Sequence, residues 1–366
     1  MDKRKLQRLS QPVVDVYLGI EEQILVNIAK RLARHDTLLE EDIQLWQSQS
    51  LDEIESLSNE NLEFIAEQSG KTVKAIRKAL QDAGYGSLME NEDILQEAAK
   101  AGRLNEAPPI KESAALLSIL ESYERQALNT FNLVNTTMLD QSRQAYLDII
   151  NRTTGQVLAG VSTPREALRQ TVSEWAEIGV PALVDRSGRR WTTEAYVSMI
   201  TRSTSNNVAN DMQQARFDEY GVDLIEVSSH AGARPLCAPY QGRVYSRSGN
   251  SNKFPPFSET SYGHPAGLFG VNCGHVQYPY IDGISRKTYQ PYPKRENDRI
   301  YENSQKQRYL ERRIRYAKRE MSMMEAMGDS EGMEIAKRKV LDRQANIRQF
   351  IKRTGRTRRY EREQIS

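Results

Sequence analysis

Apolar residues at helical spacing near the N-terminus constrain the fold more than any other feature of this chain. In "VYLGIEEQILVNIAKRLARHD", the residues that recur every three or four positions are Tyr17, Ile20, Ile24, Ile28 and Leu32. This spacing places their side chains on one face of a helix, and such a face must be buried against other parts of the chain. The N-terminal region is therefore predicted to consist of packed helices.

A glycine interrupts the next helical stretch, "NLEFIAEQSGKTVKAIRKALQDAGYG". Ser69-Gly70 is predicted to break this stretch, Thr72 to cap a second helix, and Gly84 to end it. The second helix carries four cations, Lys71, Lys74, Arg77 and Lys78. Two interpretations stay open: a helix-turn-helix that binds DNA, and a helical hairpin that only packs.

Signals for helix ends recur along the middle of the chain. The proline pair 108–109 interrupts any helix, and Glu112 or Ser113 can begin another. Apolar residues then return at helical spacing over residues 115–160, which predicts one long helix or two. Hydroxyl side chains that can cap a helix start follow at Thr163-Pro164 and at Thr192-Thr193. Each of these pairs is predicted to begin a further helix.

The apolar spacing changes after Gly221. "VDLIEVSSH" is a predicted strand because of its run of Val, Leu and Ile, and "GRVYS" is a second predicted strand after a turn at Gln241-Gly242. The predicted fold class is α+β and predominantly helical. It comprises an N-terminal helical region, a small α+β module around residues 221–283 and a C-terminal basic helical hairpin.

Charge divides the chain into an acidic body and a basic tail. Residues 285–366 contain 23 Lys and Arg against 12 Asp and Glu, whereas residues 1–284 contain 28 against 37. The tail is predicted to form two helices hinged at residues 328–332, with residues 352–363 disordered until they meet an acidic surface. Its cations either bind nucleic acid or an acidic protein partner, or form only a solvated helical face. The residues expected at such an interface are Arg312, Arg313, Arg315, Lys318, Arg319, Lys352, Arg353, Arg356, Arg358 and Arg359.

Composition indicates a water-facing protein made in the cytoplasm. With 38% hydrophobic and 27% charged residues, the chain has no stretch that approaches the roughly 18 to 20 uninterrupted apolar residues of a membrane span. Acidic residues appear too early at the N-terminus for a signal peptide, so no membrane partner is expected. Two cysteines in 366 residues argue against a disulfide framework, and the thiols are expected to be reduced or bound to metal.

Cysteines and histidines gather in one segment, although the chain has only two cysteines and four histidines. His230 and Cys237 lie near the first predicted strand, and Cys273 and His275 follow in "GVNCGH". Thiolate and imidazole are ligands that Zn²⁺ prefers, so these four residues are predicted as a structural zinc site. Their spacing differs from that of ordinary zinc modules. Two other interpretations stay open: buried cysteines beside locally satisfied histidines, and a catalytic site of Cys-His or Asn272-His type, which lacks a carboxylate spaced to orient a histidine.

These same residues carry a family resemblance. "EVSSHAGARPLCAPYQGRVYS", followed by "GHPAGLFGVNCGHVQYPYIDG", resembles the phage minor capsid protein 2 family of tailed phages that infect Gram-positive bacteria, a relative of the Mu F-like head morphogenesis proteins. The resemblance extends upstream through "SGRRWTTEAYVSMITRSTSNNVANDMQQARFDEYG" and covers about residues 10–290. It is specific at residues 228–282, and the basic tail is not mapped onto the family.

The resemblance implies a structural virion protein without enzyme activity. Such a protein, assembled in the host cytoplasm, would associate with the portal protein and with the major capsid protein or scaffold in the capsid interior during head assembly and DNA packaging. Three segments are expected: an N-terminal helical region over residues 1–106, a minor capsid domain over 112–284 in which helices precede the small module, and the basic tail over 285–366. The tail is expected to contact packaged DNA or an acidic portal surface. The alternative is a zinc-dependent or Cys/His-based enzyme or toxin-like module carried in the phage head.

Overall fold

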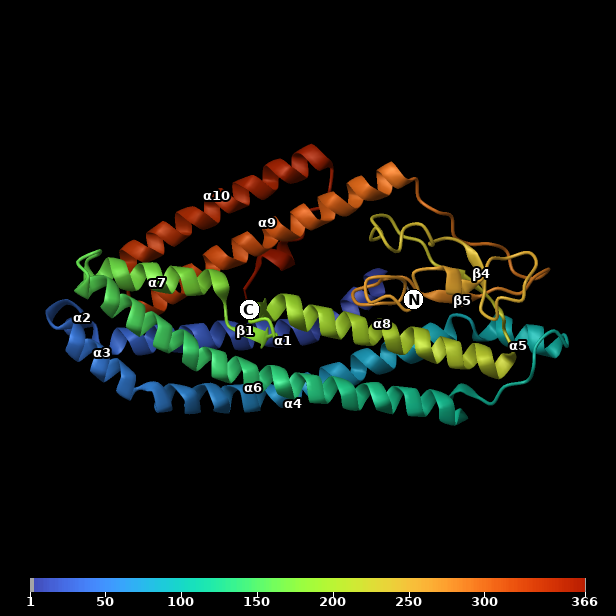
Figure 1. Cartoon of the computed structure of the whole chain (residues 1–366), viewed down its shortest axis with the longest axis horizontal. Helices are drawn as coiled ribbons and strands as arrows, with labels where there is room; N and C mark the ends of the chain where they lie inside the picture. Colours follow the sequence, from blue (N-terminus) through green and yellow to red (C-terminus); the bar gives the residue numbers. More distant parts are fainter. Residues whose placement is uncertain (1–2, 366) are drawn as a thin grey trace. The chain divides into compact units, whose positions relative to one another are not determined.

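The computed structural model describes residues 3–365 and is predominantly helical (Figure 1). Its strands form a two-stranded and a three-stranded antiparallel sheet within the described residues, which confirms the predicted α+β class. No helix in this described part is long and apolar enough to cross a membrane.

The helices and strands alternate in blocks along the chain. The α-helices are α1 Lys3–Leu32, α2 Asp36–Glu41, α3 Ile43–Asp52, α4 Ile54–Met89, α5 Glu92–Lys100, α6 Ala114–Leu158, α7 Pro164–Ile178, α8 Thr193–Tyr220, α9 Lys294–Met327 and α10 Ser330–Thr354. The strands are β1 Pro181–Val184, β2 Arg190–Thr192, β3 Leu224–Val227, β4 Val244–Ser246 and β5 Gln277–Pro279. Short 3₁₀ helices lie at Ala33–His35, Ile110–Glu112, Phe257–Glu259 and Tyr360–Glu363.

The chain divides into two compact units, each made of three stretches of sequence. Unit 1 comprises Met1–Val14, Val73–Thr130 and Ser198–Ser304, and unit 2 comprises Asp15–Thr72, Phe131–Val197 and Gln305–Ser366. Each of the ranges expected from the sequence, 1–106, 112–284 and 285–366, supplies residues to both units. Those ranges stay a prediction about segments of the chain.

The predicted apolar stripe of the first helix is buried in unit 2. Its five members are between 0 and 1% exposed, and they are Tyr17, Ile20, Ile24, Ile28 and Leu32. The Tyr17 ring stacks on Phe131 of α6 with ring centroids 5.3 Å apart, and its hydroxyl donates to Asn135 Oδ1 at 2.8 Å. The stripe therefore packs against a helix more than a hundred residues away in the sequence, as expected for an amphipathic helix.

The predicted break at Ser69-Gly70 and the predicted helix end at Gly84 are both wrong, because α4 runs without interruption through these residues to Met89. Thr72 does not cap a helix start; its hydroxyl donates to the Gln68 carbonyl one turn earlier, at 3.2 Å. A glycine inside a helix costs about 1 kcal/mol relative to alanine, which is less than the gain from burying side chains such as Ile65 and Ile76 along the same helix. Without the turn, the segment is neither a helix-turn-helix nor a helical hairpin.

The predicted helix starts are confirmed at each cap. Ser113 Oγ accepts from the backbone N–H of Leu116 at the start of α6, which is one helix and not two. Thr163 and Glu166 form a reciprocal capping box at the start of α7, and Thr192 Oγ1 accepts from the N–H of Ala195 in the first turn of α8. Local hydroxyl chemistry was sufficient to place these ends.

The three-stranded sheet of unit 1 has β3 at its centre, between β4 and β5, with both neighbours antiparallel to it. The predicted strands at 222–230 and 242–246 are confirmed as β3 and β4. The edge strand β5 and the β1–β2 hairpin of unit 2 were not predicted. The strands β1, β2 and β5 are only three or four residues long, and β5 contains a proline. Such short strands give no clear strand pattern in the sequence.

The basic tail forms the predicted pair of helices, α9 and α10, which lie side by side (Figure 1). Asp329, in the predicted hinge, caps α10 by accepting from the N–H of Gly332 at 2.9 Å. Each helix of the pair buries apolar side chains, among them Ile314, Met324 and Ile347, each at most 1% exposed. The hinge prediction is therefore confirmed.

Candidate functional site

The Cys/His segment of unit 1 lies on two loops that the central strand brings together. Cys237 lies in a tight turn after β3, in which its N–H donates to the Arg234 carbonyl at 2.9 Å. Cys273 and His275 lead directly into β5, whose pairing with β3 fixes their position. Asn272, just before them, has a positive φ of 59°, a conformation that asparagine tolerates better than most residues. Its N–H donates to Ser203 Oγ at 3.0 Å.

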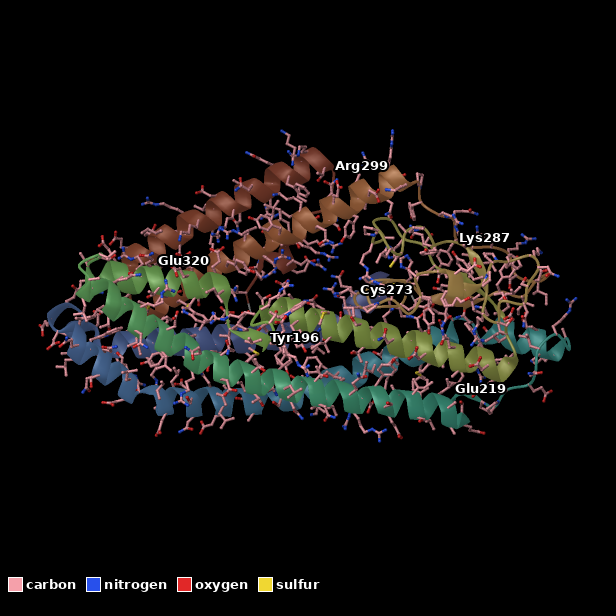
Figure 2. All side chains as sticks on the ribbon, in the orientation of Figure 1. Tyr196, Glu219, Cys273, Lys287, Arg299 and Glu320 are labelled. Atoms are coloured by element: carbon pink, nitrogen blue, oxygen red, sulfur yellow. The ribbon has the colours of Figure 1, made fainter. Side chains whose placement is uncertain are left out.

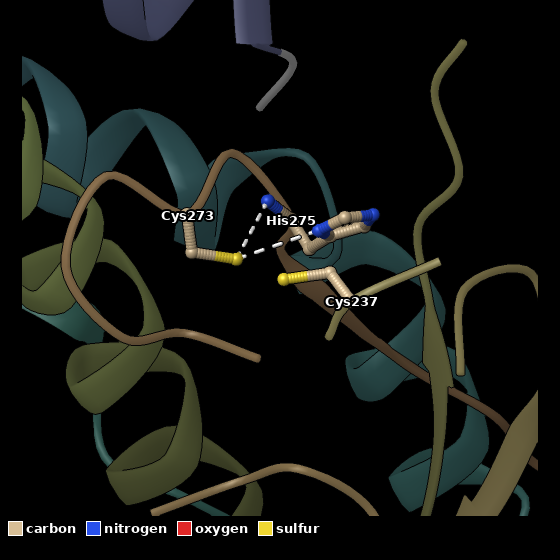
Figure 3. Close-up of side chains that lie close together, drawn as sticks. All are labelled: Cys237, Cys273 and His275. Carbon is tan, nitrogen blue, oxygen red and sulfur yellow. Dashed lines mark hydrogen bonds between the residues drawn. The ribbon is translucent and has the colours of Figure 1, made fainter. Parts of the chain in front are cut away.

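Three of the four predicted zinc ligands converge. The ligand atoms of Cys237, Cys273 and His275 all lie within 4.8 Å of one another (Figure 3). Cys273 Sγ is 3.4 Å from His275 Nδ1, and the backbone N–H of His275 also donates to that sulfur at 3.4 Å. The three residues are 0, 4 and 1% exposed, respectively. They border an apolar cluster that includes Phe217, Tyr245 and Phe257.

His230, the fourth predicted ligand, lies beside this group and not within it. Its ring stacks on that of His275, with centroids 4.4 Å apart and planes inclined by 23°. An ion bound in the plane of one ring would lie well away from the plane of the other, so the two imidazoles do not point at a common centre. The structure thus brings three of the predicted ligands together and leaves His230 as their neighbour.

Polar neighbours that the sequence did not indicate complete the site. Gln241 Oε1 lies 3.3 Å from His275 Nε2 and also accepts from the backbone N–H of His230 at 3.0 Å. Arg234 Nη2 lies 3.7 Å from Cys237 Sγ and donates to the Gly267 carbonyl at 3.0 Å. Arg234 therefore binds a backbone carbonyl near the thiols. No motif in the sequence links Gln241 to the cysteines.

The pKa values of the two thiols are shifted in opposite directions. The hydrogen bond that joins them, together with burial, raises the pKa of the Cys237 thiol. The same hydrogen bond lowers the pKa of Cys273 well below its ordinary range, and although burial opposes this, the neighbouring His275 adds to the lowering. Of the two residues, Cys237 therefore holds its proton more strongly than Cys273.

The burial of this group bears on the kind of chemistry that it can support. A thiolate beside an imidazole is the arrangement of a catalytic cysteine, but such cysteines lie in partly exposed positions where a substrate can reach the sulfur. Here both cysteine residues are at least 96% buried. Buried thiolate and imidazole groups that face one another are suited to holding an ion or fastening two loops.

The cations predicted at an interface occupy several environments in unit 2. Four bind carboxylates of the same unit: Arg313 binds Glu177, Arg315 binds Glu194, Arg319 binds Glu21 at 2.6 Å, and Arg358 binds Glu363 at 2.6 Å. Lys318 and Arg356 donate to the amide oxygens of Gln364 and Gln307, at 2.5 and 2.6 Å. Arg312 and Arg359 are half-buried, and Lys352 and Arg353 are exposed in the last turn of α10.

The end of the tail is ordered, contrary to the prediction for residues 352–363. Residues Tyr360–Glu363 form a 3₁₀ turn, and the Glu363 carboxylate, which is 2% exposed, accepts from Arg358. The prediction was wrong because the segment carries its own acidic partner. Polar contacts inside unit 2 extend further: Glu320, labelled in Figure 2, accepts from Ser173 at 2.7 Å and from Lys339 at 2.6 Å.

Comparison with known proteins identifies the family. The family model described as "Phage minor capsid protein 2" matches residues 1–352, which extends past residue 290 and includes most of the basic tail. A "Structural protein" of Lactococcus phage LL-H is 28% identical over 368 residues, covering 95% of this chain and 97% of the relative. A "Structural protein" of Lactococcus phage mv4 is 33% identical over 115 residues, covering 31% of this chain and 94% of the relative. No solved structure matches the chain. The match over nearly the whole chain shows that this protein belongs to the phage minor capsid protein 2 family.

Proposed function

We propose that this chain is a structural component of a tailed-phage head that works by binding other head proteins and not by turning over a substrate. Its partners would be the portal protein and the major capsid protein or scaffold, contacted from the capsid interior during assembly in the host cytoplasm. The family match over residues 1–352 carries this proposal. Both relatives are structural proteins of phages, which agrees with it.

An exposed apolar surface in unit 1 supports a protein partner. Leu236, Tyr262 and Val271 are 44, 44 and 41% exposed and come from three neighbouring loops. Ser261 Oγ donates to the Leu236 carbonyl at 2.6 Å, and Arg234 donates to the carbonyls of Gly267 and Val271, so the loops are held together. Apolar side chains grouped on a fixed surface commonly mark a protein interface.

The buried Cys/His group supports a role without catalysis. Because Cys273 is 4% exposed and His275 is 1% exposed, a substrate would have to displace the loops that bear them. The contact between Cys273 and His275 would suit the Cys/His-based enzyme considered from the sequence, but the burial of both residues opposes that interpretation. We therefore propose an architectural role for the group.

Co-purification with the portal protein tests the assembly role. The full chain would be produced together with the portal and major capsid proteins of the same phage, and the complexes would be separated by size. A double variant, Leu236→Asp with Val271→Asp, is expected to reduce co-purification at least severalfold, because charge is placed in an apolar interface. The matched control is Leu133→Asp, at a 69% exposed position of α6 in unit 2, and this variant should still co-purify with the portal protein. Failure of the unaltered chain to associate with any head protein would contradict the proposal.

The exposed end of α10 supports a second contact, with packaged DNA. Lys352 and Arg353 are the exposed members of the predicted cationic set, and phosphate contacts of this kind weaken steeply with salt. In a binding titration on duplex DNA, the double variant Lys352→Glu with Arg353→Glu should bind more weakly and with a shallower salt dependence. Lys74→Glu, an exposed helical cation of unit 1, serves as the control. Unchanged salt dependence in the double variant would assign these cations to a protein partner.

A further inference from the structure

We infer that Cys237, Cys273 and His275 form a Zn²⁺ site that fastens the two loops of the unit 1 module. The inference starts from convergence: the chain has two cysteines, and both meet a histidine with all three ligand atoms within 4.8 Å. The loop that carries Cys237 and the loop that carries Cys273 are separated by dozens of residues with little regular structure. Soft thiolate ligands and imidazole nitrogen are the donor set that favours zinc over magnesium or calcium.

The spacing of the ligand atoms fits a tetrahedral ion. With Zn–S of about 2.3 Å and Zn–N of about 2.0 Å, a sulfur and a nitrogen ligand lie about 3.5 Å apart and two sulfurs about 3.8 Å apart. The Cys273 Sγ to His275 Nδ1 distance is 3.4 Å, and no pair in the group exceeds 4.8 Å. An ion therefore fits among these atoms with side-chain movements of about 1 Å or less.

The neighbouring groups prepare His275 and Cys237 as ligands. An amide oxygen only accepts, so the contact between Gln241 Oε1 and His275 Nε2 requires the proton on Nε2. This leaves the lone pair on Nδ1, the nitrogen that faces Cys273, which is how an outer partner orients a metal-binding histidine. The guanidinium of Arg234 lies 3.7 Å from Cys237 Sγ and would stabilise the negative charge that this sulfur carries once it gives up its proton to an ion.

His230 is assigned as a neighbour of the site and not as a ligand. Its ring lies against the face of His275, and its backbone N–H shares the Gln241 oxygen with that residue. In this position it holds His275 from one side while Gln241 holds the other.

The metal content of the full chain tests the inference. Protein purified under reducing conditions, without chelator and without a metal-affinity step, should contain about one zinc per chain by elemental mass spectrometry. Cys273→Ser and His275→Ala should lose the metal. His264→Ala removes an exposed histidine of the same module and should keep it, and His230→Ala should also keep it. Loss of zinc from His230→Ala as complete as from Cys273→Ser would overturn the assignment of three protein ligands.

A measurement on the unaltered chain keeps the test valid even if the cysteine variants do not fold. After removal of metal with a chelator, Co²⁺ is added and the absorption spectrum is recorded. The inferred site should give the intense visible bands of tetrahedral cobalt together with a thiolate-to-cobalt charge-transfer band, and Zn²⁺ should abolish both. A pale octahedral spectrum, with two free thiols or one disulfide found by thiol titration, would overturn the inference.

Discussion

In the module around residues 221–283, side chains bind the backbone of distant segments, whereas side chains of the hairpin of α9 and α10 mainly pair with other side chains. The Glu226 carboxylate, 3% exposed, accepts from the N–H groups of Thr288 and Tyr289 at 2.9 and 2.6 Å. In the hairpin, Lys339 instead donates to Glu320 and Asp329 accepts from Arg169.

The difference follows from how each region satisfies its backbone. A helix bonds its own N–H and C=O groups, so the contacts between helices are left to side chains, and many of these are interchangeable. The strands of the module are only three or four residues long, so most of its backbone N–H groups lie outside the sheet. Each of these N–H groups that is buried needs its own acceptor. A single substitution should therefore lower the free energy of unfolding more in the module than in the hairpin.

The largest effect is expected from Gly242→Ala in the module. Gly242 has a φ of +65°, and an added Cβ would lie 2.5 Å from the Gln290 carbonyl carbon and 2.7 Å from the Pro291 nitrogen. We expect a loss of about 3 kcal/mol in the free energy of unfolding, measured by urea denaturation, because strained backbone and a clash with backbone add together. Gly283→Ala is the control, since φ is +82° there but the space is open, and should lose only about 1 kcal/mol. Equal losses would show that the close approach of residue 290 is unimportant.

A smaller but still large effect is expected from Glu226→Ala. The change leaves the N–H groups of Thr288 and Tyr289 without their acceptor, and should cost about 2 to 3 kcal/mol in urea denaturation. Glu259→Ala, at an exposed position of the same module, should change stability by less than about 0.5 kcal/mol. If both variants were equally stable, the module would not depend on side chain to backbone bonds.

An intermediate effect is expected in the hairpin from Asp329→Ala, which removes a helix cap and an ion pair together. Asp329 accepts from the N–H of Gly332 at 2.9 Å and from Arg169 at 2.7 and 3.0 Å. The free energy of unfolding should fall by about 2 kcal/mol near neutral pH. Asp342→Ala, an exposed carboxylate of α10, should have little effect.

The same variant gives the hairpin a predicted pH dependence. Partial burial raises the pKa of Asp329, but hydrogen bonds from Arg169 and from the Gly332 N–H outweigh it and hold that pKa below its usual value. A carboxyl whose pKa is lower in the folded state stabilises fully above its unfolded pKa of about 4, and this contribution is lost as pH falls through the folded pKa. The stability difference between the unaltered chain and Asp329→Ala should therefore be constant above about pH 5 and shrink below about pH 4. A difference that does not vary down to acid unfolding would contradict the assigned partners.

The smallest effect is expected from Lys337→Ala on the outer face of α10. Lys337 pairs with Glu334 at 3.2 Å, and the two side chains are 57 and 51% exposed. Such a pair contributes about 0.3 kcal/mol, which thermal unfolding in low salt should detect only marginally. A loss above about 1 kcal/mol would mean that exposed pairs stabilise the hairpin as strongly as buried contacts.

Much of the helical framework could be predicted from sequence because its determinants are local. The buried stripe from Tyr17 to Leu32, the caps at Ser113 and Thr163, and the hinge before α10 all follow from residues within a few positions of one another. The break at Gly70 was mispredicted because burial along the whole of α4 outweighs the local cost of one glycine. Short strands such as β5 were missed because their pairing, and not their composition, defines them.

The sequence by itself determined which residue types are present for a metal site and placed Cys237, Cys273, His275 and His230 in one segment. Only the tertiary structure decided that three of them converge, that Gln241 sets the orientation of His275, and that Arg319 faces Glu21 within unit 2. The reason is physical: periodicity and capping act over one or two helical turns, whereas ligand geometry and ion pairing depend on which distant segments the packed core brings within a few ångströms.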